Sequence, residues 1–254
     1  MLEVVEITKR YAEITAVDRV SFAIKPYEVV GYLGPNGSGK TTTVNMLTGL
    51  LRPSSGEIRL DGVKIEQNRK DYKRRIGYVP EEPALYPYLN AIEYLELVGR
   101  LRLLPEAPIR RRTEDLLALL GLHPHRFTPL SSYSKGMKQK VLVAAALLHD
   151  PDILFLDEPF SGLDVESALV LRRLIELLGQ KGKMILFSSH VLEIVERVCS
   201  RVIILSGGRV VADDSIARLR ELSRKPSLEA VFAQLAVHQD IDEVASGILD
   251  TIST

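Results

Sequence analysis

Short apolar runs rich in β-branched residues recur along the chain and predict buried strands. Five of these runs lie at residues 29–33, 76–79, 153–156, 184–187 and 202–205. Strands that are apolar on both faces are typical of parallel sheets covered by helices. Between most of the five runs, apolar residues recur at the spacing of a helix. Three further runs, at residues 4–7, 20–24 and 57–60, predict an antiparallel layer near the start. The pattern as a whole indicates an α/β fold.

Residues 82–150 contain no predicted strand, and their apolar residues recur at the spacing of a helix instead. Apolar positions at residues 91–104 and 110–120 predict two helices of an inserted helical subdomain, with prolines and glycines supplying the breaks. Residues 214–254 carry short amphipathic segments and predict a C-terminal helical tail. We therefore expect one domain over residues 1–254. It comprises a catalytic core with the antiparallel layer at 1–81 and 151–213, a helical subdomain at 82–150, and the tail.

The charge balance, the cysteine count and the lengths of the apolar runs limit the kinds of protein that this chain can be. The chain has 33 basic and 33 acidic residues, which argues against general nucleic-acid binding because that function usually requires a basic excess. The single cysteine, Cys199, cannot form an internal disulfide and is expected to be buried. The longest apolar run, residues 141–148, is well short of the roughly 20 residues that span a bilayer. Because the start also lacks a secretion signal, we expect a cytoplasmic protein whose membrane part, if it works at a membrane, belongs to another subunit.

The strongest local motif follows the predicted strand at residues 29–33. Its eight residues fit the pattern G-x-x-x-x-G-K-[ST] and are Gly34, Pro35, Asn36, Gly37, Ser38, Gly39, Lys40 and Thr41. In such a loop, backbone N–H groups and the following helix N-terminus bind phosphates. Lys40 would reach the β and γ phosphates, Thr41 would bind Mg²⁺, and Thr42 would complete the site. The alternative is a chance glycine-rich turn, and the motif alone fits kinases and GTPases as well as ATPases.

A second candidate group lies at the end of the predicted strand 153–156, where Asp157 and Glu158 follow. A carboxylate beside a phosphate-binding loop can hold Mg²⁺, and a neighbouring carboxylate can accept a proton from the attacking water. We assign Asp157 to the metal and Glu158 to the general base. Taken alone, paired acidic residues after an apolar run are often only a solvated strand end.

The segment from Tyr133 to Lys140 narrows the class further. It resembles the signature motif of the ATP-binding cassette (ABC) family, which normally reads Leu-Ser-Gly-Gly-Gln with a glutamine and a basic residue soon after. The chain keeps Ser134, Gly136, Gln139 and Lys140, and it departs from the motif at Tyr133, Lys135 and Met137. Read without the family, Ser134 is simply an N-cap of the helix that follows. The resemblance implies that Ser134 and Gly136 face the γ-phosphate held by a second cassette.

Other motifs of the family occur before and after the signature, in the expected order, between Tyr11 and residue 213. The resemblance implies that Tyr11 stacks on adenine with Val17 beside it, and that His190 senses the γ-phosphate as a catalytic residue. Glu81 stands where many members have a glutamine that contacts the metal. The sequence Ser161-Gly162-Leu163-Asp164 resembles the loop that touches the opposite cassette.

The resemblance also implies a fold and an activity. The expected fold is a P-loop NTPase core of the RecA-like type with an antiparallel β subdomain and an inserted α-helical subdomain. The expected activity is ATP hydrolysis with ATP and Mg²⁺ bound between two cassettes, either two copies of this chain or one copy and a related subunit.

The same resemblance implies separate transmembrane permease subunits, docked near residues 82–95, and a peripheral position on the cytoplasmic face of the membrane. The signature, Glu81 and the tail pattern at residues 227–232 resemble bacterial or archaeal exporters. We expect no nucleic-acid partner. A soluble cassette ATPase that acts on the ribosome or on DNA is the alternative, and a regulatory module that holds ATP without cleaving it is a third reading.

Overall fold

Two sheets form the framework of the protein in a computed structural model that describes residues 1–189, 191–236 and 251. A four-stranded antiparallel sheet has the order β2-β1-β4-β5, and a six-stranded sheet has the order β10-β9-β3-β8-β7-β6. The antiparallel sheet comprises β1 (Leu2–Tyr11), β2 (Ile14–Ile24), β4 (Ser55–Leu60) and β5 (Val63–Lys64). Its first two strands are longer than the predicted apolar runs.

The six-stranded sheet contains all five predicted buried strands. These are β3 (Val29–Leu33), β6 (Ile76–Val79), β7 (Ile153–Asp157), β8 (Met184–Ser188) and β9 (Arg201–Ser206), and neighbouring members pair in parallel. Every residue of β3, β7 and β8 is buried, which explains why their sequences are apolar without alternation. The predicted α/β class with an antiparallel layer is confirmed.

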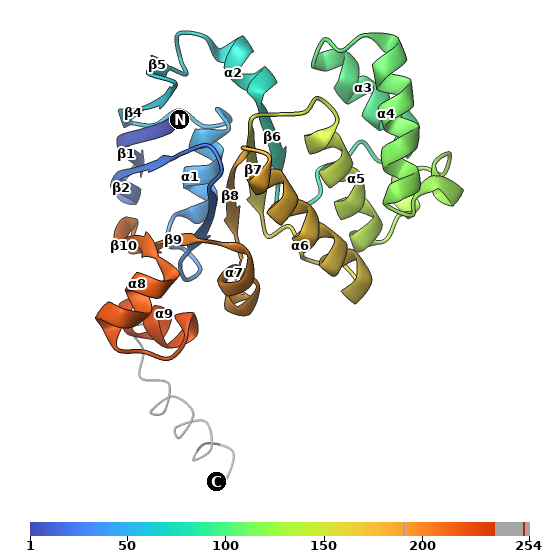
Figure 1. The fold of residues 1–254 in the computed structure, drawn as a ribbon. Helices are drawn as coiled ribbons and strands as arrows, with labels where there is room; N and C mark the ends of the chain where they lie inside the picture. The colour runs from blue at the N-terminus through green and yellow to red at the C-terminus, as the bar shows by residue number, and fades with distance from the viewer. Residues whose placement is uncertain (190, 237–250, 252–254) are drawn as a thin grey trace.

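Helices cover both faces of the parallel sheet. Helix α1 (Lys40–Leu47) lies between the two sheets, and α6 (Val165–Gln180) and α7 (Leu192–Val198) lie on the opposite face (Figure 1). One core cluster fills the space between the antiparallel sheet and the parallel sheet, and a second fills the face under α6 and α7. The sheet is thus buried on both sides, as its strand sequences require.

The regular elements between β6 and β7 are all helical, apart from an isolated bridge between Asn90 and Pro129, and loops connect them. This segment contains α3 (Ala91–Leu101), α4 (Glu106–Leu119), two short 3₁₀ turns and α5 (Lys135–Leu147), which share their own apolar cluster. Helix α2 (Arg69–Arg75) precedes β6. The predicted helix at 91–104 ends earlier, at Leu101. The second helix begins earlier than predicted because Pro105 is its N-cap and Pro108 lies in the first turn, where proline is tolerated.

Two strands, the short β5 and β10, were not anticipated from the sequence. Strand β10 (Arg209–Ser215) pairs antiparallel with β9 through a turn at Gly207 and Gly208, both of which have positive φ. It is an edge strand whose positions mostly alternate between exposed and half-buried, and its apolar stretch covers only residues 210–212. The glycine pair between two strands is the hairpin signal that could have revealed it.

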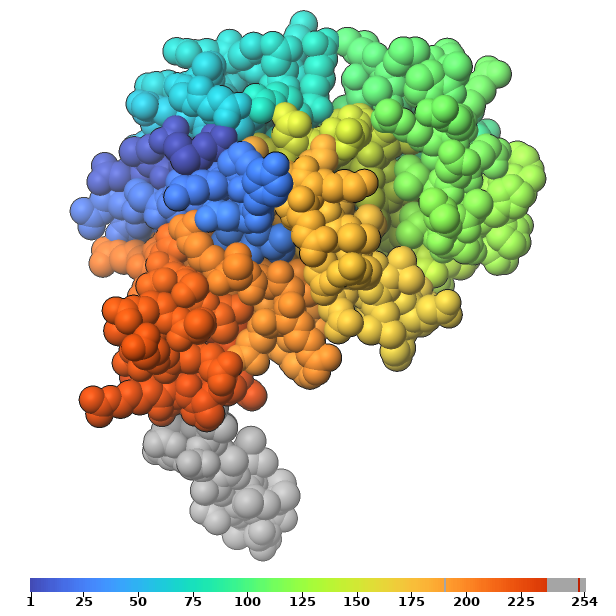
Figure 2. All heavy atoms as spheres, in the orientation of Figure 1, coloured from blue at the N-terminus to red at the C-terminus, as the bar shows by residue number. Residues whose placement is uncertain are grey.

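The tail therefore starts inside a strand, and its helices follow. Helices α8 (Ile216–Ser223) and α9 (Leu228–Ala236) lie in the two predicted amphipathic segments and pack against α7, β9 and β10. Figure 2 shows this red-orange part lying directly against the orange segments that precede it. The rest of the predicted tail, apart from residue 251, lies outside the described residues. No helix among the described residues is long and apolar enough to cross a membrane.

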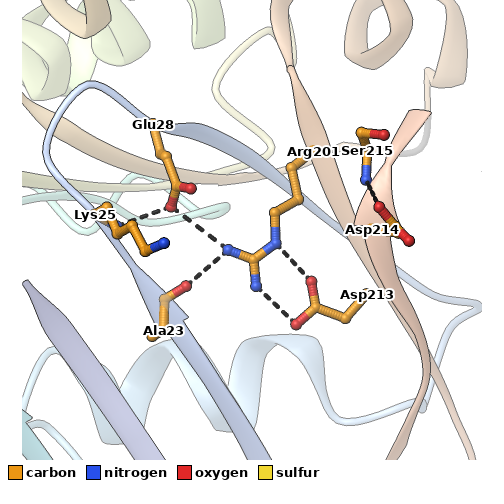
Figure 3. Close-up of polar contacts among 7 residues, drawn as sticks. All are labelled: Ala23, Lys25, Glu28, Arg201, Asp213, Asp214 and Ser215. Atoms are coloured by element: carbon orange, nitrogen blue, oxygen red, sulfur yellow. Dashed lines mark hydrogen bonds and ion pairs between the residues drawn. The ribbon is translucent and has the colours of Figure 1, made fainter. Parts of the chain in front are cut away.

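Arg201, at the start of β9, joins three parts of the fold (Figure 3). Its Nε and Nη2 atoms donate to the two carboxylate oxygens of Asp213 in β10 at 2.6 and 2.7 Å. Its Nη1 atom donates to the Ala23 carbonyl oxygen at 2.9 Å and to Glu28 at 3.4 Å. Since Ala23 belongs to β2, this one guanidinium ties the antiparallel sheet to the edge of the parallel sheet.

Candidate nucleotide site

The phosphate-loop motif forms a tight turn between β3 and α1. The Lys40 ammonium donates to the carbonyl oxygens of Gly34 and Pro35 at 2.7 and 3.2 Å, so the lysine closes the loop on itself. Lys40 is half-buried, and this burial lowers its pKa, although Glu158, Asp157 and Glu81 oppose the shift. The partly desolvated ammonium can attract a phosphate anion, whereas the three carboxylates repel it unless a cation neutralises them.

Two glycines of the loop are required by close contacts. A Cβ atom at Gly34 would lie 2.3 Å from the Ser38 hydroxyl oxygen and 2.7 Å from the Leu205 carbonyl oxygen. Gly39, the N-cap of α1, has a φ of 99°, and a Cβ there would lie 2.5 Å from the Ala16 carbonyl oxygen. The loop therefore needs glycine at these positions for space and for backbone conformation.

The two candidate carboxylates stand at the end of β7 and are held by one serine. Asp157 is 1% exposed and accepts a short hydrogen bond from the Ser188 hydroxyl of the neighbouring strand β8. The Glu158 backbone N–H donates to the same hydroxyl oxygen at 3.1 Å. Glu158 has a φ of 48°, in the left-handed region that glutamate rarely adopts. Such backbone strain tends to occur at functional sites.

These groups open into one groove of about 980 Å³. Its walls contain every residue of the loop motif except Ser38, together with Thr42 and the three carboxylate residues Glu81, Asp157 and Glu158. Ser38 is buried beneath the loop. Four further residues that the sequence did not indicate as site residues also line the groove: Ala16, Ser189, Leu192 and Phe232. The groove brings a cation, phosphate-binding backbone and acidic side chains together, as hydrolysis of a nucleoside triphosphate requires.

The donor set also fits a magnesium ion. The second carboxylate oxygen of Asp157 is buried and finds no hydrogen-bond partner among the residues that the structure describes. Burial of an ionised oxygen without a partner is costly, so a cation would relieve it. Mg²⁺ is commonly held by one or two carboxylates together with substrate phosphates, and the Thr41 hydroxyl shares the groove.

Neither of the two residues expected at the adenine lines the groove. Tyr11 ends β1, is 48% exposed and has the Lys9 ammonium 5.3 Å from its ring centroid. Val17 has no exposed surface and packs beneath Gly39 instead. A direct contact between Val17 and a base therefore does not agree with this structure, in which the preceding residue Ala16 lines the groove. His190 lies outside the described residues.

The signature residues occupy a different surface. Ser134 is exposed and caps α5, accepting a hydrogen bond from the Met137 N–H at 3.2 Å. Neither Ser134 nor Gly136 lines the groove. Gly136 approaches the loop after Glu158 closely, because a Cβ there would lie 2.5 Å from the Gly162 carbonyl oxygen. One chain thus presents the groove with the phosphate-loop motif and, separately, an exposed helix N-terminus.

The same loop is tied to the signature helix by two side chains. The buried Gln139 amide donates to the Pro159 carbonyl oxygen at 3.1 Å, and the Lys140 ammonium lies 3.8 Å from Asp164. Asp164 caps α6 by accepting the Ser167 N–H at 2.8 Å, and the hydrogen bonds from Ser167 lower the pKa of this carboxylate. The signature helix is therefore in direct contact with the segment that carries Glu158.

Comparison with known proteins agrees with these motifs. Residues 17–161 match the family model described as ABC transporter. The chain is 39% identical over 237 residues to the ABC transporter ATP-binding protein NatA of Bacillus subtilis, covering 91% of this chain and 96% of the relative. It is 39% identical over 213 residues to the Nod factor export ATP-binding protein I of Ralstonia nicotianae, covering 84% and 66%.

Solved structures give the same result. The structure of an ATP-binding subunit of an ABC transporter superposes with a TM-score of 0.87 at 34% identity, covering 92% of this chain and 99% of that one. The cassette MJ0796, in a dimeric post-hydrolysis state with ADP and Pi, superposes with a TM-score of 0.77 at 28% identity, covering 85% and 98%. The chain therefore belongs to the ABC transporter family and is an ATP-binding, ATP-hydrolysing subunit of an ABC transporter.

Proposed function

We propose that this chain powers a separate transmembrane permease from the cytoplasmic face of the membrane, and that the complex exports its substrate. The relative named for Nod factor export supports the direction of transport. The absence of a membrane-spanning helix among the described residues fits a permease on another chain. Residues 82–150 would act as the helical subdomain, with the permease docked near residues 82–95.

Within one chain, the groove would bind the nucleotide and carry the catalytic groups. Lys40 and the loop N–H groups would bind the phosphates, while Asp157 and Thr41 would hold Mg²⁺, with Glu81 in the same groove. When bound, the ion neutralises charge on the phosphates. Glu158 accepts the proton of the attacking water, and Ser188 fixes the backbone from which it extends. Tyr11 contacts the base, and His190 contacts the γ-phosphate.

The complete site would require a second cassette. Each copy offers a groove with Lys40, Asp157 and Glu158, and a separate exposed helix end at Ser134 and Gly136. A helix N-terminus with free N–H groups suits the γ-phosphate of a nucleotide held by the other copy. The dimeric state of MJ0796 supports this arrangement. ATP would then join the subunits, and its cleavage would let them separate.

The observation that carries the proposal is this separation of two half-sites on one chain. The direct test is purification of the chain under native conditions from membranes solubilised in mild detergent. We expect the chain to be recovered together with an integral membrane protein. The molar ratio of the two proteins should be the same for the unaltered chain and for Glu158→Gln, with and without ATP. Recovery with ribosomes or with DNA instead would overturn the transport function while leaving the ATPase activity unaffected.

A further inference from the structure

One side chain in the nucleotide groove comes from the C-terminal tail. Phe232, in the middle of α9, lines the groove together with Leu192, the first residue of α7. Phe232 lies outside residues 17–161, which match the ABC transporter family model. It is the last residue of the tail pattern at residues 227–232. Phe232 is half-buried, so part of its ring packs on the core while the remainder faces the groove.

Helix α9 is firmly docked where this contact is made. Leu228 and Val231 have no exposed surface, and the Leu228 N–H donates to the Glu196 carboxylate of α7 at 2.6 Å. Since Leu192 belongs to the same helix α7, the contacts of α9 fix the start of α7 at the groove. In Figure 1, α7, α8 and α9 lie together beside β9 and β10.

The chemistry of the two side chains differs from that of the rest of the groove. Lys40, Asp157 and Glu158 are charged, whereas Phe232 and Leu192 form an apolar wall. Apolar surface left in water costs free energy, so this wall favours states of the groove in which it is covered. A ligand that extends to this side of the groove would cover it.

We propose that α9 is an integral part of the nucleotide site and that Phe232 is a positioning residue, which holds the wall at Leu192 so that the groove binds ATP. Docking of α9 and binding of ATP are then linked, and each strengthens the other by the same factor. The tail thereby gives the cassette a control element, because anything that detaches α9 weakens ATP binding. This inference rests on the proposed nucleotide site.

A matched pair of variants in the full chain tests the role of Phe232. Leu235 lies in the same helix and packs on the same core cluster, but it does not line the groove. We expect Phe232→Ala to raise the KM for ATP about fivefold or more relative to Leu235→Ala, and Phe232→Leu to restore most of the affinity. Equal KM values for Phe232→Ala and Leu235→Ala would overturn the proposal.

Hydrogen exchange tests the reverse direction and does not depend on the folding of Phe232→Ala. ATP added to the Glu158→Gln chain should slow amide exchange in residues 228–236, and an unchanged rate would contradict the linkage. Lys40→Ala separates the two hypotheses. If Lys40→Ala keeps normal ATP affinity, the proposed nucleotide site is wrong. If it abolishes binding while ATP still leaves α9 exchange unchanged in the Glu158→Gln chain, only the role of α9 is wrong.

Discussion

Ser188 donates its hydroxyl hydrogen to the Asp157 carboxylate across the β7–β8 pair, in a region with almost no exposed surface. The same oxygen accepts the N–H of Glu158 at 3.1 Å. One hydroxyl therefore positions both the proposed metal ligand and the proposed general base. The second oxygen of Asp157 is left for a cation, because it finds no protein donor among the described residues.

Removal of this hydroxyl should impair hydrolysis. We expect Ser188→Ala to lower ATP turnover about 10- to 100-fold, the usual scale for loss of a group that orients a metal ligand. Ser188→Thr, which keeps the hydroxyl, should retain most of the activity. The control is Ser54→Ala, since Ser54 also accepts a backbone N–H, from Arg10 at 3.1 Å, but does not line the groove. Equal turnover of Ser188→Ala and Ser54→Ala would show that the serine has no part in the site.

The general base is tested by Glu158→Gln. We expect ATP binding to persist while turnover falls roughly 10²- to 10⁴-fold, because an amide cannot accept the proton. Steady-state phosphate release and equilibrium ATP binding should be measured on the same preparation. Turnover close to that of the unaltered chain would remove Glu158 from this role.

The second half-site is tested by Ser134→Arg. The change removes a helix cap, at a cost of about 1 kcal/mol in the free energy of unfolding, and places a bulky charge on the proposed interface. We expect ATP binding by the monomer to remain and the ATP-dependent dimer to disappear in size-exclusion chromatography with light scattering. Ser215→Arg is the matched control, because Ser215 caps α8 with the same geometry, accepting the Arg218 N–H at 3.2 Å. A dimer that survives Ser134→Arg would argue against a nucleotide shared between the subunits.

The connection between the sheets is tested by Arg201→Met. Its loss leaves Asp213 and Glu28 without their partially buried cation, and we expect the free energy of unfolding to fall by about 2 kcal/mol. Arg209→Met should cost clearly less, since the Arg209 side chain is 64% exposed where it pairs with Asp18. Urea unfolding of both variants measures the difference. A similar decrease in the free energy of unfolding of both variants would mean that the contacts of Arg201 contribute no more than an exposed surface ion pair.

The sequence predicted most of the framework because its strands are buried on both faces. Continuous apolar runs such as residues 153–156 leave few other interpretations, and the loop motif that follows the strand at residues 29–33 predicts where the phosphates bind. Strand β10 was missed because an exposed edge strand has no such run. Its only local signal was the pair Gly207 and Gly208.

The parts of the site that the sequence did not reveal depend on contacts between distant segments. Nothing in the local sequence marks Ser188 as a site residue, because it meets Asp157 only through the pairing of β8 with β7. Phe232 reaches the groove only because α9 folds back onto α7. Val17 was expected at the base, but its alternation within β2 turns it into the core, and Ala16 takes the position at the groove.

The most direct test of the central claim is ATP turnover per chain as a function of chain concentration, with the oligomeric state measured under the same conditions. If the groove of one copy must meet the Ser134 helix end of another, turnover per chain should fall toward zero on dilution to monomers and rise steeply as dimers form. Full turnover in a preparation that stays monomeric would contradict the account.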